Sequence, residues 1–72
     1  MVEEKLRGLS EMQSALVQRV LEEVGEVAAS SLELVLRKGP KAKRFQAINL
    51  VQFRKICILA EEAGIDLPTK EI

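Results

Sequence analysis

The sequence contains no histidine, tryptophan or tyrosine, and its 72 residues include a single cysteine, Cys57. The absence of histidine removes the usual general base and the commonest metal ligand. One thiol can form neither a disulfide within the chain nor a cysteine-rich zinc site. Cys57 also lies among apolar neighbours without a basic catalytic partner, which is typical of an inert, buried thiol. We therefore expect that the chain is not an enzyme, holds no metal and needs no cofactor.

Aromatic rings and glycine clusters are also scarce. Phe45 and Phe53 are the only aromatic side chains, so the stacking platforms that bind single-stranded nucleic acid are nearly absent. The four glycines are widely spaced and form no glycine-rich phosphate loop. If the chain binds nucleic acid, contact with the phosphates of a duplex is favoured over base stacking.

Long apolar runs are missing as well. Charged residues interrupt every apolar stretch before it reaches the length of about 18 residues that a membrane-spanning helix needs. The first residues, Met1-Val2-Glu3-Glu4, are acidic rather than basic, unlike the start of a signal peptide. A single unpaired thiol fits a reducing compartment. We expect no membrane association and a cytoplasmic location.

Apolar side chains are nevertheless abundant, at 47% of the chain. In a domain of fewer than about 80 residues, one hydrophobic core rarely supplies more than about 3–5 kcal/mol of stability. So short a chain also has little interior in which to bury these side chains. Because disulfides and zinc are excluded, we expect the chain to gain stability as a homodimer or by docking on a helical partner protein.

Apolar residues recur every three or four positions in two long segments, a spacing that predicts amphipathic helices. Ser10 and Gln13 have the pattern of a capping box, which favours a helix start at Ser10. The first helix either runs continuously or bends near residues 28–31, and Lys38-Gly39-Pro40 marks its end. The predicted elements of this single 72-residue domain are a helix at about 10–37, a basic loop at 38–44, a helix at about 45–63 and a short tail at 64–72.

The second predicted helix is apolar on two sides. Phe53 and Ile56 belong to one broad side, while Val51 and Ile58 belong to a second stripe with Ala47. One partner helix within the chain cannot cover both sides, so we predict an all-α helical hairpin that pairs into a dimeric antiparallel bundle. The residues predicted to make the protein contact are Leu16, Val20, Val24, Val27, Leu50, Phe53, Ile56 and Ile58.

Charge is segregated along the chain although the formal net charge is zero. Residues 34–60 contain seven basic and no acidic side chains, whereas residues 1–33 contain seven acidic and three basic ones, and residues 61–72 four acidic and one basic. A basic segment of this kind either contacts phosphates or forms a solvated surface that complements the acidic segments. The candidate phosphate-binding residues are Arg37, Lys38, Lys41, Lys43, Arg44, Arg54 and Lys55.

A further hint of nucleic-acid binding lies in residues 59–65, Leu-Ala-Glu-Glu-Ala-Gly-Ile. This segment resembles the first helix and turn of helix-turn-helix repressors, with Ala60 and Gly64 at the spacing of the small residue and the turn glycine. Pro68, and Lys70 as the only following cation, depart from the pattern of a DNA-reading helix. The leading hypothesis is a non-enzymatic protein–protein interaction module, an adaptor or regulator. The alternative is a small dimeric regulatory protein that contacts nucleic-acid phosphates through residues 37–55.

Overall fold

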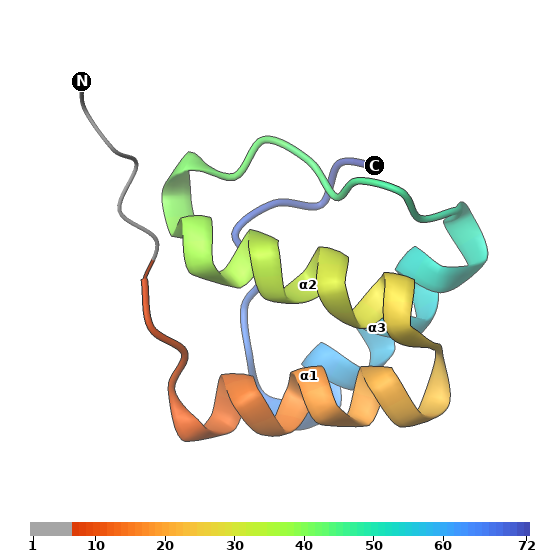
Figure 1. Ribbon diagram of the computed structural model, residues 1–72, viewed down its shortest axis with the longest axis horizontal. Helices are drawn as coiled ribbons and strands as arrows, with labels where there is room; N and C mark the ends of the chain where they lie inside the picture. The colour runs from red at the N-terminus through yellow and green to blue at the C-terminus, as the bar shows by residue number, and fades with distance from the viewer. Residues whose placement is uncertain (1–6) are drawn as a thin grey trace.

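The computed structural model describes residues 7–72, and this part of the chain is all-α, as predicted (Figure 1). Its elements are helix α1 (Glu11–Glu23), helix α2 (Glu26–Lys38), a 3-10 turn η1 (Gly39–Lys41) and helix α3 (Leu50–Ala63). Within residues 7–72, no helix combines the length and the apolar character required to cross a membrane.

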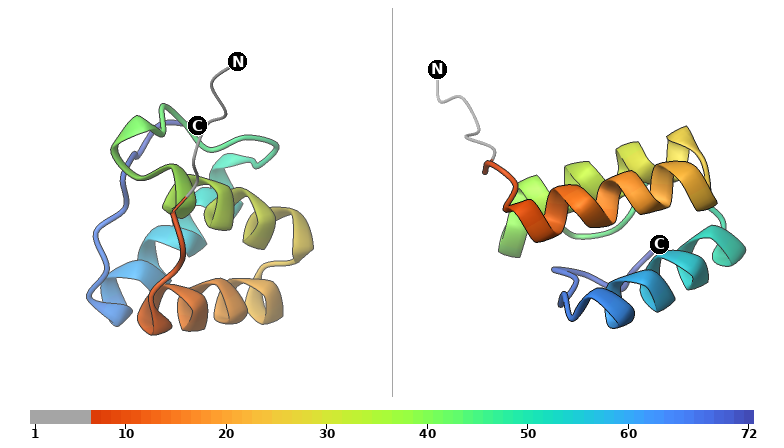
Figure 2. Two further views of the ribbon diagram at one scale, coloured as in Figure 1. Left: turned by 60° about the vertical axis from the view of Figure 1, so that its left-hand side comes forward. Right: turned by 90° about the horizontal axis from the view of Figure 1, so that it is seen from below.

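The three α-helices form a small bundle in which each helix packs on the other two. Helices α1 and α2 run in opposite directions as a tight hairpin (Figure 1). Helix α3 begins at the same end of the molecule as the α1–α2 turn and lies across the hairpin (Figures 1 and 2). A long loop connects η1, at one end of the hairpin, with the start of α3 at the other (Figure 1).

The prediction of one helix over about 10–37, either continuous or bent near 28–31, is wrong. Residues 28–31 lie within α2, and the chain reverses at Gly25 instead. Gly25 has φ 137° and ψ 172°, a backbone region that is essentially restricted to glycine. The reversal brings the apolar faces of the two segments together, so that Val20 on α1 and Leu32 on α2 are both fully buried in one core. The free energy gained from that burial is larger than the free energy that a helix continuing through the glycine would gain from its backbone hydrogen bonds.

The predicted helix at 45–63 begins five residues later than expected, at Leu50. Asn49 is its N-cap: the Asn49 side chain accepts a hydrogen bond from the Gln52 backbone N–H at 2.9 Å, and the Gln52 side chain accepts one from the Asn49 N–H at 3.0 Å. Ala47, two residues earlier, has a left-handed φ of 63°, which is incompatible with a continuing helix. The loop is therefore longer than the predicted 38–44.

Among the described residues 7–72, twelve apolar residues form the buried core. Phe45 comes from the loop, is only 2% exposed and packs its ring edge-on against Phe53, with centroids 5.5 Å apart. The alanines at 28, 29 and 60 are small enough to let the helices approach closely. The core residues are Leu16, Val20, Ala28, Ala29, Leu32, Val35, Leu36, Ala42, Phe45, Ile56, Leu59 and Ala60.

The C-terminal tail holds the loop in place. The Phe45 backbone N–H donates to the Glu71 carbonyl at 2.7 Å, and the Thr69 hydroxyl donates to the Lys43 carbonyl at 2.9 Å. On the other side of the loop, the Gln46 N–H donates to the buried Ser31 hydroxyl at 3.1 Å. These bonds keep Phe45 inside the core although no helix carries it.

Substitution of Gly25 tests the reversal. We expect Gly25→Ala to lower the free energy of unfolding by about 1–3 kcal/mol, because a methyl group disfavours this backbone conformation even though the space around it is open. Gly8→Ala is the matched control, since Gly8 also has open space around it but no positive φ. Urea unfolding followed by circular dichroism measures both. Equal stability of the two variants would contradict the assignment of Gly25 as the essential turn residue.

Candidate interaction surface

The eight residues predicted to mediate docking divide into three groups. Buried in the core are Leu16, Val20 and Ile56. Partly buried and packed against the core are Val24 and Phe53. Exposed are Val27, Leu50 and Ile58. Only the exposed and partly buried residues can touch a partner while the chain stays folded, so the core residues act in folding rather than in docking.

Helix α3 has an apolar stripe on the side that faces away from the core. Ile58 is 56% exposed and Val51 is 62% exposed, although both are large apolar side chains. They are seven positions apart, about two helical turns, so they lie above one another on the same side of α3. Ile56 and Ala60, on the opposite side, are buried. The seven-residue spacing was visible in the sequence, but Val51 was not among the residues predicted to dock.

Charged side chains surround Ile58 on this surface. Arg54 and Lys55 precede it by one turn, and Glu61 and Glu62 follow it by one turn; all four are exposed. Along the outer face of α3, the apolar Val51 is followed by the basic Arg54 and Lys55, then by the apolar Ile58, and then by the acidic pair Glu61 and Glu62. We call the set Val51, Arg54, Lys55, Ile58, Glu61 and Glu62 the outer face of α3.

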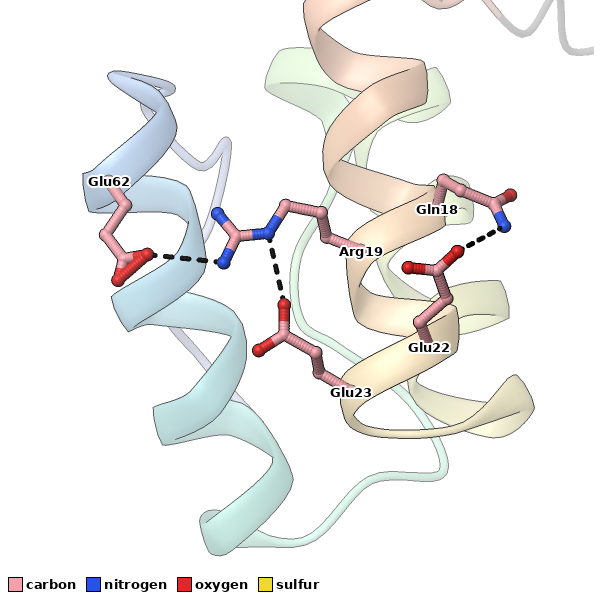
Figure 3. Close-up of polar contacts among 5 residues, drawn as sticks. All are labelled: Gln18, Arg19, Glu22, Glu23 and Glu62. Atoms are coloured by element: carbon pink, nitrogen blue, oxygen red, sulfur yellow. Dashed lines mark hydrogen bonds and ion pairs between the residues drawn. The ribbon is translucent and has the colours of Figure 1, made fainter.

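A groove of about 310 Å³ runs along one edge of this face, between α1 and α3. Figure 3 shows the Arg19 side chain reaching from α1 between two carboxylates, with Nε 3.1 Å from Glu23 Oε2 and Nη2 3.4 Å from Glu62 Oε1. Because all three side chains are about half exposed, these ion pairs add little to stability. Together they link α1 to the C-terminal turn of α3 across the groove. The groove is lined by Arg19, Glu23, Val24, Lys55, Ile58, Leu59 and Glu62.

The structure does not gather the seven candidate phosphate-binding residues into one cluster. Arg37 is already engaged: its Nε lies 3.2 Å from Glu33 Oε2, and its Nη1 donates to the Arg7 carbonyl at 3.3 Å. None of the other six forms an ion pair with an acidic side chain among residues 7–72. They are distributed over the end of α2, η1, the loop and α3, and are Lys38, Lys41, Lys43, Arg44, Arg54 and Lys55.

The resemblance to helix-turn-helix repressors holds for the turn but not beyond it. Gly64 ends α3 in the left-handed conformation, with φ 69° and ψ 28°, and the Ile65 N–H donates to the Ala60 carbonyl at 2.9 Å. Residues 65–72 contain no helix, and part of this tail is bonded to the loop. The described part of the chain therefore has no second helix that could enter a DNA groove after this turn.

Cys57 lies half-buried on α3, beside a small pocket that Asp66 and Lys70 also line. Burial raises the pKa of the Cys57 thiol, and the charge of Glu61 acts in the same direction, while Lys70 lowers it to a smaller extent than burial raises it. Among residues 7–72, no three cysteine, histidine or acidic side chains come together to hold a metal ion. These surroundings favour a protonated, unreactive thiol.

No protein family, curated protein or solved structure matches this chain significantly. Its candidate function therefore rests on the residues of its own surface.

The reactivity of Cys57 follows from its surroundings. We expect iodoacetamide at pH 8 to modify Cys57 in the folded protein at least about threefold more slowly than in the urea-unfolded chain, because a raised pKa leaves less thiolate. The rate in the folded protein should increase as the pH rises towards 10. Mass spectrometry at timed intervals measures both rates, and equal rates in the two states would contradict the assignment.

Proposed function

We propose that this protein is a non-enzymatic interaction module, an adaptor or regulator, that associates with itself through the outer face of α3. The observation that carries the proposal is the exposure of Val51 and Ile58 on one side of a helix whose opposite side, with Ile56 and Ala60, is buried in the core. Full burial of an aliphatic side chain of this size contributes about 1.5–3 kcal/mol. A second helix laid across Ile58 would supply that burial at the centre of this stripe.

The composition of the surface supports the same conclusion. An apolar centre surrounded by charged groups is the usual arrangement of a protein–protein interface. Here Ile58 is the centre, and the basic pair Arg54 and Lys55 and the acidic pair Glu61 and Glu62 form the rim. The adjacent groove adds the partly buried Val24 to the apolar area that a partner can cover. In this proposal, specificity comes from the rim and most of the affinity from the centre.

The effect of Ile58→Asp tests the proposal. We expect the wild-type protein to sediment as a dimer at micromolar concentrations, and Ile58→Asp to weaken the association at least about tenfold, equivalent to 1.4 kcal/mol, because a carboxylate would be placed in the apolar centre. Ile58 is 56% exposed in the single chain, so the variant should keep its fold by circular dichroism.

Met12→Asp is the matched control for that experiment. Met12 is 58% exposed but lies on α1, outside the proposed contact, so this variant should still form the dimer. Analytical ultracentrifugation of the three proteins over a concentration series gives the comparison. A wild-type protein that stays monomeric up to hundreds of micromolar would refute self-association.

A second candidate function is contact with nucleic-acid phosphates. The observation that favours it is the exposure of Lys41, Lys43 and Arg44 on η1 and the loop, without ion pairs to acidic side chains in residues 7–72. Cations that are not neutralised by the protein itself are available for phosphates. Helix α3 adds Arg54 and Lys55 to the positive charge, but on a different element.

Salt dependence separates this candidate from the first. If the loop binds duplex DNA, the logarithm of the association constant should fall with the logarithm of the salt concentration by about 0.9 for each phosphate neutralised. Lys43→Ala and Arg44→Ala should each reduce that slope by about 1. Fluorescence anisotropy with labelled duplex DNA and RNA measures it. Absence of binding at low ionic strength would eliminate the candidate and leave the α3 proposal untouched.

A further inference from the structure

We infer that the dimer partner is a second copy docked with its α3 antiparallel to the first, about a twofold axis that passes beside Ile58. This inference rests on the proposed function and specifies the orientation and register of the contact. It follows from the order of charges along the outer face of α3. Arg54 and Lys55 precede Ile58 by four and three residues, and Glu61 and Glu62 follow it by three and four.

An antiparallel arrangement makes this surface complementary to itself. A twofold axis at Ile58 reverses the direction of the second helix, so the basic half of each α3 lies against the acidic half of the other. The position of Arg54 then differs from that of the partner's Glu61 by one residue along the axis, about 1.5 Å, and the same holds for Lys55 and the partner's Glu62. These offsets are small enough for the long side chains to meet.

The angular positions of the charged residues around the axis of α3 support the same pairs. At 100° per residue, Arg54 and Glu61 lie on one side of the Val51–Ile58 stripe, and Lys55 and Glu62 lie on the other. A twofold axis perpendicular to the helices and within the contact plane keeps each side of one helix next to the same side of its partner. Two Arg54–Glu61 pairs and two Lys55–Glu62 pairs would therefore flank the two Ile58 side chains.

A parallel arrangement is disfavoured by the same charges. In a parallel twofold pair each residue faces its own copy, so Arg54 and Lys55 would face cations and Glu61 and Glu62 would face anions. Like charges that lie opposite each other across an interface are destabilising. The order of charges thus selects one orientation, while Ile58 sets the register. The ion pair of Glu62 with Arg19 is compatible with the contact, because a carboxylate can accept from two cations.

Charge reversal tests the orientation. The double variants Arg54→Glu/Lys55→Glu and Glu61→Lys/Glu62→Lys each make the outer face of α3 uniformly charged in sign. We expect each alone to associate at least about tenfold more weakly than the wild type, because like charges would then face each other across the contact. An equimolar mixture of the two should recover association, because each variant then faces the opposite charge. Circular dichroism of each variant verifies that the helices remain folded.

Disulfide trapping tests the register. In a Cys57→Ala background, Ile58→Cys should cross-link under mild oxidation, since residues that face each other across the twofold axis approach to the Cα separation of a disulfide, about 4.4–6.8 Å. Val51→Cys is the matched control: in the antiparallel register its two copies are 14 residues apart along the axis, about 21 Å, and should not cross-link. A parallel pair would cross-link both variants.

The outcomes distinguish this inference from the proposed function. A wild-type dimer whose charge-reversed variants do not recover on mixing, or in which Val51→Cys cross-links as readily as Ile58→Cys, would overturn the antiparallel register while leaving self-association in place. A monomeric wild-type protein would overturn both. Recovery on mixing, together with cross-linking confined to Ile58→Cys, would support the inference.

Discussion

At Gly25 the backbone adopts φ 137° and ψ 172°, and the chain turns back so that α2 packs along α1. Without this reversal, Val20 and Leu32 would lie on one extended helix, too far apart along its axis to share a core. With the reversal, Val20 and Leu32 are both fully buried. Helix α3 packs on the surface that α1 and α2 form together, and Ile56 and Ala60 are buried there. The reversal interrupts the backbone hydrogen bonds of a continuous helix. The free energy gained from the apolar burial that it permits is several times larger than the free energy of the lost hydrogen bonds. The rest of the bundle depends on it.

The bundle buries more apolar surface within one chain than the composition alone suggested. Within residues 7–72, twelve residues form a continuous core, with the loop residue Phe45 as one of its largest members. Seven large apolar side chains nevertheless remain exposed among residues 7–72. Isolated exposed side chains of this kind are normal in soluble domains. What distinguishes Val51 and Ile58 is their shared position on one helix face with ordered charges around them.

The tertiary structure also determines which residues lie beside each charged side chain. As a linear sequence, residues 34–60 form one basic block. In the fold this block is divided. Arg37 is paired with Glu33 on α2, the loop cations form no ion pair with an acidic side chain in residues 7–72, and Arg54 and Lys55 share a helix face with Glu61 and Glu62. Two of its seven cations, Arg54 and Lys55, thereby supply the basic half of the proposed self-complementary pattern. A cation of this block is compatible with phosphate binding or with an ion pair to a partner, and the residues that lie near it in the fold distinguish these two interpretations.

Local signals in the sequence determined the helical class, the capping box at Ser10 and the helix ends at Gly39 and Gly64, because each depends on residues within one or two turns. The tertiary structure alone decided the reversal at Gly25, since glycine is compatible with a helix at a cost of about 1 kcal/mol and with a turn at none. It also decided that Phe45 lies in a loop, held by a hydrogen bond to the distant Glu71. Burial between segments far apart in the sequence made these choices, and that energy is absent from any local pattern.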